Sequence, residues 1–264
     1  MGRARLFEWE DQPWLPRDLR DIVTDHLRFA FSAPGAVNMR ETVADILEPP
    51  LRRSGSDTIV DVCSGGGGPL PAALPLLSAR LGPLKATLTD LYPNTAAFGQ
   101  LAKKSEGALA GETRSISAFD VPAELGRFQT LFTAFHHFKP EDAKRILADA
   151  ASKGRTIVVI EPFKRRDFWI VTFGGFLRGL VLTPVVGELT LARLLWTYPI
   201  PISPFVVAWD GAVSCLRAYG APEMEALGRE AAPSYHWEAG ERPIPGPLKL
   251  SITYLIGEPE AVTA

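Results

Sequence analysis

Apolar and polar positions recur along this chain with two different periods, and the period changes several times. Between Arg17 and Phe31, apolar side chains return every three or four positions, which is typical of an amphipathic helix. The same spacing returns between Met39 and Leu47. From Thr58 onward, short apolar runs alternate with helical stretches. This alternation predicts a parallel sheet wound on both faces by helices.

The predicted strands are short apolar runs bounded by turn residues. They are expected at residues 58–63, 86–89, 114–117, 128–132 and 156–160. Helices are expected at residues 69–80, 95–103 and 140–154, the last of which begins at a proline followed by two acidic residues and ends at a glycine. Two further runs, at residues 234–238 and 250–256, flank the turn-rich sequence ERPIPGP and predict a terminal antiparallel hairpin.

The alternation of strands and helices stops after Glu161, where aromatic residues and prolines dominate. Two helices are expected beyond this region, near residues 209–217 and 222–229. Its longest apolar stretch, Phe168 to Gly187, has Arg178 at its middle and Pro184 near its end. Since a charge at the centre of a bilayer is costly, this stretch favours a helix that lines an apolar cavity or dips into a membrane surface over one that spans the membrane.

Composition and charge narrow the classes of function. The chain has 264 residues, of which 46% are hydrophobic, enough for one large α/β core with a small cap. Its formal net charge is −2 and it has no run of five like charges, which argues against a nucleic-acid partner. The two cysteines lie in different contexts and the N-terminus lacks the apolar core of a signal peptide, so we expect a cytoplasmic location.

A run of glycines follows the first predicted strand directly, in the sequence DVCSGGGGP that begins at Asp61. A strand that ends in an acid and leads through glycines into a helix brings bare backbone and a positive helix end beside a ligand. Asp90 ends the next strand, where a carboxylate accepts hydrogen bonds from both hydroxyls of an adenosine ribose. Asp120, in AFDVP, is placed to accept from the adenine amine, with Phe119 or Val121 against the ring.

Two other interpretations of the glycine run are weaker. A tight strand-to-helix turn without a ligand would leave the accompanying acids unexplained. A nicotinamide dinucleotide also uses glycines and a strand-end acid at the start of a βαβ unit. In this sequence, however, Leu70 or Pro71 stands where the third glycine of G-x-G-x-x-G is required.

With these motifs in place, the stretch from Thr58 to Pro162 resembles the class I (Rossmann-like) S-adenosylmethionine-dependent methyltransferases, including their ubiquinone-biosynthesis-type branch. The matching sequences are DVCSGGGGP, TLTDLYP, AFDVP and FTAFHHF. The resemblance implies a doubly wound, mostly parallel seven-stranded sheet with a reversed last strand, N-terminal helices and a helical cap inserted after the fifth strand. The chain departs from the family at Cys63, which stands where the first glycine of D-x-G-x-G-x-G is usual.

The resemblance implies S-adenosylmethionine as the cofactor. The implied cofactor-binding residues are Asp61, Cys63, Ser64, Gly65, Gly66, Gly67, Asp90, Leu91, Phe119, Asp120, Val121 and Thr133. The expected domains are an N-terminal helical cap (1–50), a cofactor-binding core (51–162), a helical substrate cap (163–230) and a C-terminal hairpin that completes the sheet (231–264).

Three residues are candidates for catalysis. Methyl transfer from a sulfonium needs little covalent help, but a hydroxyl or carbon acid acceptor requires a base. His136 and His137 follow the fourth strand, at the edge where ligands bind. Alternatively, one histidine bonds a backbone carbonyl while the other packs against the cofactor. Glu161, in VVIEP, either faces the acceptor or caps a turn. No metal is expected, because no Cys or carboxylate cluster accompanies the histidines.

Aromatic residues near both ends of the core imply a hydrophobic small-molecule acceptor, such as a lipid, a quinone-like compound or a secondary metabolite. It would bind beneath a lid formed by Arg17 to Phe31 and Phe163 to Trp209. Two alternatives stay open. The first is a lyase or cyclase built on the same cofactor fold. The second is a membrane-peripheral binding protein anchored by Phe168 to Gly187.

Overall fold

The computed structural model describes residues 3–32, 39–247 and 249–260. The chain forms two compact units. The helical unit comprises Met1–Ala33 and Phe163–Tyr219, and the sheet unit comprises Pro34–Pro162 and Gly220–Ala264. These boundaries differ from the expected domains, because residues 40–54 and 221–231 form helices that belong to the sheet unit.

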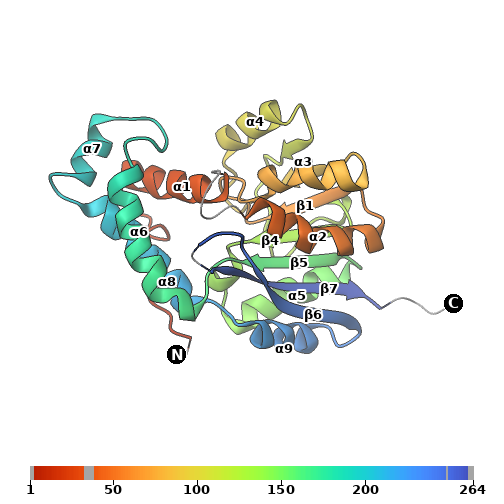
Figure 1. The fold of residues 1–264 in the computed structure, drawn as a ribbon. Coiled ribbons are helices and arrows are strands. Elements are labelled where there is room, and N and C mark those ends of the chain that lie inside the picture. The colour runs from red at the N-terminus through yellow and green to blue at the C-terminus, as the bar shows by residue number, and fades with distance from the viewer. Residues whose placement is uncertain (1–2, 33–38, 248, 261–264) are drawn as a thin grey trace. The chain divides into compact units, whose positions relative to one another are not determined.

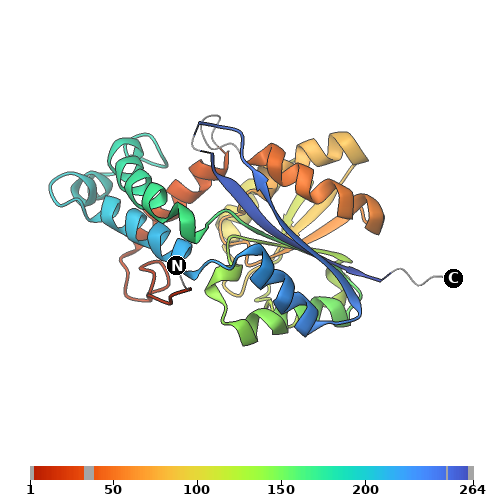
Figure 2. The same ribbon diagram turned by 60° about the horizontal axis from the view of Figure 1, so that its bottom comes forward.

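The sheet unit is built on a seven-stranded sheet with the order β3-β2-β1-β4-β5-β7-β6 (Figures 1 and 2). Its strands are β1 (Thr58–Val62), β2 (Lys85–Leu88), β3 (Leu109–Gly111), β4 (Phe128–Phe132), β5 (Thr156–Glu161), β6 (Tyr235–Pro243) and β7 (Ser251–Pro259). The first five strands pair in parallel, whereas β7 is antiparallel to both β5 and β6. The fold class predicted from the sequence, including the reversed last strand and the terminal hairpin, is confirmed.

The predicted third strand is wrong. The strand lies at Leu109–Gly111 and not at residues 114–117, which follow it without regular pairing. Glycine is uncommon inside strands, so the sequence pattern did not predict a strand that ends at Gly111. In the structure, a Cβ at Gly111 would collide with the Phe98 side chain. Glycine is therefore required there by the close approach of a helix, and this tertiary reason is invisible to a local pattern.

Helices cover both faces of the sheet, as Figures 1 and 2 show. They are α2 (Arg40–Ser54), α3 (Leu70–Leu81), α4 (Thr95–Lys104), α5 (Pro140–Ser152) and α9 (Ala221–Ala231). In both views α2 and α3 lie on one face, with α5 and α9 on the other. The carboxyl ends of β1, β2, β4 and β5 meet at one edge, where their loops can hold a ligand.

The helical unit contains α1 (Arg17–Ser32), α6 (Phe168–Leu182), α7 (Leu191–Thr197) and α8 (Ile202–Arg217). The N-terminal segment lies along α8, because the backbone N–H groups of Trp9 and Glu10 donate to the Asp210 carboxylate at 2.7 and 3.0 Å. Among the described helices, none is both long and apolar enough to cross a membrane alone. By length and composition only, α7 and α8 would pass as a pair, with a bend of 70° between them.

Two glycines let α6 pack closely on α8. A Cβ on Gly175 would lie 3.3 Å from the Ala208 Cα, and one on Gly179 only 2.8 Å from the Pro204 Cα. The two glycines are four positions apart and therefore share one face of the helix. The surface between α6 and α8 thus depends on the absence of side chains at these two positions.

We expect Gly179→Ala to lower the free energy of unfolding by about 1–3 kcal/mol, because the new methyl group overpacks the contact with Pro204. Gly174→Ala is the matched control, since no atom lies within 4 Å of a Cβ at that position in the same helix. It should be neutral or stabilise by up to about 1 kcal/mol. Chemical denaturation of both variants checks the prediction. Equal effects of the two substitutions would contradict it.

Candidate active site

Asp61, the next-to-last residue of β1, anchors the glycine turn by hydrogen bonds from the buried side. Its carboxylate accepts hydrogen bonds from the Ser64 hydroxyl at 2.6 Å and from the Thr130 hydroxyl on β4 at 2.7 Å. The side chain is buried, and burial raises the pKa of its carboxyl group to about 7 although both hydroxyls act to lower it. Asp61 and Ser64, both predicted site residues, therefore shape the turn from inside the protein.

Two residues at neighbouring strand ends adopt the left-handed backbone conformation that favours glycine. Cys63 follows β1 with a φ of 56°, and Thr133 follows β4 with a φ of 53°. For residues with a Cβ this conformation is strained, and such strain is concentrated at functional sites. Cys63 thus keeps the turn wound as a glycine would. Burial raises the pKa of its thiol to about 12, which leaves the thiol protonated at neutral pH.

Gly65 meets Asp90 at the top of the turn. The Gly65 N–H donates to one Asp90 carboxylate oxygen at 2.8 Å, and the Tyr92 N–H donates to the other at 2.9 Å. A Cβ on Gly65 would meet no atom within 4 Å, so this part of the turn faces open space. By contrast, a Cβ on Gly67 would lie 2.5 Å from Leu101 of α4. The two glycines therefore have different structural roles. Gly65 borders the candidate ligand site, whereas Gly67 allows close packing of a helix.

Two further predicted residues, Leu91 and Gly66, adjoin these groups along the chain. Leu91 follows Asp90 directly and its side chain is 49% exposed, which leaves an apolar surface beside the acid. Gly66 is partly buried between Gly65 and Gly67. The structure thus brings the glycine turn, Asp90 and Leu91 together, as the sequence predicted.

The structure places Asp120, predicted to accept from the adenine amine, away from the glycine turn. The Asp120 side chain is 87% exposed and pairs with Lys153 at 2.9 Å, and this cation holds the pKa of the carboxyl group below its usual range. Lys153 lies just before β5 begins, at the end of the strand opposite the glycine turn. Phe119 packs edge to face on Phe138, and Val121 is fully buried. All three predicted residues therefore face the α5 side of the sheet unit.

A segment that the sequence pattern did not place at the site, residues 115–117, runs beside Asp90. The Ile116 N–H donates to the Asp90 carbonyl at 2.9 Å, and the Ser115 hydroxyl donates to the Leu91 carbonyl at 2.6 Å. Ser117, which follows directly, is partly buried. Its position after the true third strand was the available signal, but the misplaced strand obscured it.

His136 is clamped by Glu161. It lies in the short helix η2 (Phe135–His137) directly after β4, and Glu161 is the last residue of the neighbouring β5. One Glu161 oxygen accepts from the His136 backbone N–H at 3.1 Å, and the other lies 2.9 Å from the ring Nδ1. Both side chains are buried, with 1% and 0% exposed. Glu161 therefore both caps the turn after β4 and fixes the orientation of the imidazole.

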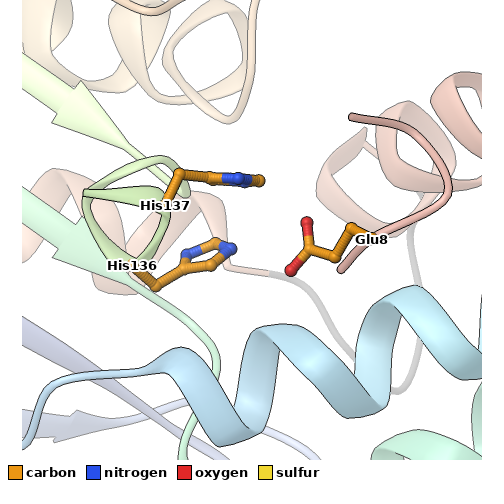
Figure 3. A group of neighbouring side chains, drawn as sticks. All are labelled: Glu8, His136 and His137. Carbon is orange, nitrogen blue, oxygen red and sulfur yellow. The ribbon is translucent and has the colours of Figure 1, made fainter. Parts of the chain in front are cut away.

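The rings of His136 and His137 lie side by side, with centroids 4.3 Å apart and planes inclined by 35° (Figure 3). Figure 3 also draws Glu8, a residue of the helical unit. The expectation that one histidine bonds a backbone carbonyl takes a different form here, since the His136 ring bonds the Glu161 carboxylate. This side-chain pair is the arrangement that positions a histidine for proton transfer.

Comparison with solved structures identifies the fold. An O-methyltransferase family protein from Burkholderia thailandensis superposes with a TM-score of 0.52 at 15% identity, over 93% of this chain and 61% of that one. A putative O-methyltransferase from Nostoc punctiforme gives 0.51 at 13% identity, over 97% and 64%. The CMeT domain of the citrinin polyketide synthase gives 0.54 at 14% identity, over 96% and 59%. The sheet and its helices thus form a methyltransferase-type Rossmann-like fold.

The likeness is one of fold, and the chain spans about three fifths of the length of these three proteins. No protein-family model matches the sequence. No curated protein matches it either. The ubiquinone-biosynthesis-type branch suggested by the motifs stays a prediction.

The buried Asp61 makes stability depend on pH. The unfolded chain carries this carboxyl group at its ordinary pKa of 3.8 and the folded chain at about 7, so the folded state binds the proton more tightly. The free energy of unfolding therefore falls as the pH rises through this interval. We expect Asp61→Asn to remove this contribution, so that its melting temperature relative to the parent protein rises between about pH 4 and pH 7.

Thermal melts across this pH range, with Asp120→Asn as the control, test the assignment. Asp120 is exposed and its pKa lies below its usual range, so it is mostly ionised between about pH 4 and pH 7 in both states. Its substitution should therefore leave the dependence of the melting temperature on pH unchanged. A melting difference for Asp61→Asn that is the same at every pH would contradict the assignment.

Proposed function

We propose that this chain is an S-adenosylmethionine-dependent methyltransferase that methylates a hydroxyl group of a hydrophobic small molecule. The observation that carries the proposal is the meeting of Gly65 with Asp90 at the carboxyl edge of the sheet, with open space beside the glycine. It stands in a fold shared with two structures named as O-methyltransferases. A carboxylate beside an unobstructed backbone turn is the arrangement that recognises a ribose next to a charged tail.

The residues present fit the cofactor. Each carboxylate oxygen of Asp90 accepts one backbone N–H and has a further lone pair for a ribose hydroxyl. Leu91 offers apolar surface for the adenine ring, and Ser117 in the adjoining segment offers a hydroxyl. The backbone at Gly65 and Gly66 would border the methionine portion. When bound, S-adenosylmethionine supplies a methyl group that is already activated by a positive sulfur.

His136 is the proposed base. With Glu161 accepting the Nδ1 proton, the lone pair of the imidazole stands on Nε2, which can take the proton of an acceptor hydroxyl. The Glu161 carboxylate then stabilises the imidazolium that forms, because the pair is buried and poorly screened. Glu161 is thus a positioning residue in this proposal, and the acceptor is oriented by other groups.

The hydrophobic class of the acceptor rests on the side chains of the helical unit. Aromatic and aliphatic residues are abundant there, and many are exposed, among them Trp14, Tyr198, Phe205 and Trp209. Apolar surface of this kind binds ligands that are themselves poorly soluble in water. The proposal therefore assigns cofactor binding to the sheet unit and recognition of the acceptor to the helical unit.

Cofactor binding is tested by calorimetric titration with S-adenosylmethionine, S-adenosylhomocysteine and NAD. We expect the two adenosyl ligands to bind and Asp90→Ala to weaken them by about tenfold or more, because two hydrogen bonds to a charged group are lost. Asp120→Ala is the control and should bind them as the parent protein does, since that side chain pairs with Lys153. Binding of NAD alone would refute the cofactor assignment.

The role of His136 is tested with acceptors selected by screening hydroxylated hydrophobic compounds for release of S-adenosylhomocysteine. We expect His136→Gln to lower turnover at saturating cofactor by roughly 10²–10⁴-fold while binding of S-adenosylhomocysteine is kept. His137→Gln is the matched control with a smaller loss. Glu161→Gln should reduce turnover and shift its pH profile, as expected of a group that acts through the imidazole. Undiminished turnover of His136→Gln would refute the role of His136 as the base.

A further inference from the structure

The helical unit turns an apolar stripe outward. On α6 the side chains of Trp169, Phe173, Leu177 and Val181 are 67%, 67%, 60% and 58% exposed. These positions are spaced by four residues and therefore form one continuous row along the helix. The Trp169 and Phe173 rings stack with centroids 5.9 Å apart. A row of this size is unusual for a surface that meets only water.

Exposed apolar side chains also occur on α7. Leu191 and Leu195, one turn apart on α7, are 73% and 52% exposed. Tyr198, at the end of α7, donates a hydrogen bond to the Leu180 carbonyl of α6 at 3.2 Å, which links the two helices. We call the set of Trp169, Phe173, Leu177, Val181, Leu191 and Leu195 the apolar face.

Charged residues are scarce in the same region, and the two arginines among them are buried at least in part. From Phe168 to Trp209 the sequence carries only three charged residues: Arg178, Glu188 and Arg193. Arg193 is buried and pairs with Asp25 of α1 at 2.5 Å, while Glu188 is exposed. The Arg178 Nε is buried without a hydrogen-bond partner among the described residues, and burial lowers the pKa of this guanidinium group.

Neutral polar groups of the helical unit are buried as well. His26 on α1 is fully buried and its Nε2 lies 3.0 Å from the Thr183 hydroxyl, and Thr197 and Ser203 share a buried hydrogen bond of 2.8 Å. The helical unit thus buries these polar groups beside its apolar core, while the large apolar side chains of α6 stay exposed. A continuous exposed apolar surface of this kind marks a site of contact with a membrane or another molecule.

Helix packing agrees with this interpretation. Gly175 and Gly179 form a G-x-x-x-G pair that brings the α6 backbone against the Pro204 and Ala208 backbone of α8. Small residues at such spacing are typical of helices that associate in lipid, where burial of apolar side chains gives no driving force. The contact between α6 and α8 therefore does not need the side chains of the apolar face, which are left for another surface.

A basic segment adjoins the apolar face. Lys164, Arg165 and Arg166 immediately precede α6, with Asp167 as the only acid among them. Lys164 is buried and lies 3.8 Å from Asp167, Arg165 is partly exposed, and the Arg166 side chain is 62% exposed. Cations beside an aromatic residue such as Trp169 are the pattern of a segment that lies at the level of acidic lipid headgroups. The charge of this segment distinguishes an anionic bilayer from a neutral apolar partner.

We propose that the apolar face docks the helical unit on the surface of an anionic lipid bilayer, with α6 lying in the interface and Arg165 and Arg166 among the headgroups. Binding combines the burial of apolar side chains in the acyl boundary with attraction of the basic segment to acidic lipids. A second copy of this chain would cover the apolar side chains as well, and the test below separates it from a bilayer.

Flotation of the purified chain with vesicles tests the proposal. We expect the chain to float with vesicles that contain phosphatidylglycerol, to float less with phosphatidylcholine alone, and to lose the difference at high salt. Phe173→Glu with Leu177→Glu should lower partitioning by roughly tenfold or more, because two charges enter the apolar boundary. Arg165→Gln with Arg166→Gln should remove the preference for phosphatidylglycerol.

The matched control is Ala96→Glu with Gln100→Glu, which adds the same two charges at the same spacing on exposed positions of α4. This control variant should float as the parent protein does. Calorimetry with S-adenosylhomocysteine on every variant measures cofactor binding independently, so that a failure of the docking proposal is distinguished from a failure of the cofactor assignment. Flotation unchanged by Phe173→Glu with Leu177→Glu would overturn the docking surface. So would a chain that does not float and forms a dimer abolished by these substitutions, since the occupant would then be a second copy.

Discussion

The buried carboxylate of Asp61 is the constraint on which the candidate site depends. It bonds the hydroxyls of Ser64 in the glycine turn and Thr130 on β4, while the carbonyl of the same residue accepts the Thr89 N–H and hydroxyl from the loop after β2. Three segments of the chain are thereby tied to one residue. Burial of an ionised acid at this position lowers the stability of the folded chain at neutral pH. Its hydrogen bonds fix the turn at the edge of the sheet.

The candidate site has two groups of residues, and both lie at the same edge of the sheet as this turn. Gly65 and Asp90 stand over β1 and β2, whereas His136 and Glu161 stand over β4 and β5. Since β1 and β4 pair directly, the position proposed to bind the cofactor and the proposed base are set by the same ladder of hydrogen bonds. A preorganised edge of this kind needs little rearrangement when ligands arrive.

Much of this was readable from the sequence, and the exceptions have physical causes. The apolar runs and glycines predicted the sheet, the reversed last strand and the position of Asp90 after the second strand, because these depend on local periodicity and on topology. The third strand was placed too late, because its true position depends on contact between Gly111 and Phe98. The clamp of Glu161 on His136 joins residues 25 apart in sequence, and only the pairing of β4 with β5 brings them together. The outward stripe of α6 was likewise hidden, since an apolar run does not show which side faces the core.

The helical unit is assembled from two segments that lie on either side of the first five strands in the sequence. During synthesis α1 is therefore made long before α7 and α8, the helices on which it packs. Its apolar stripe, which includes the later buried Leu19, Ile22 and Val23, has no partner in that interval. Such exposed surface invites aggregation in a nascent chain. The order of the segments thus leaves the early helix without its packing partners until α8 has been made.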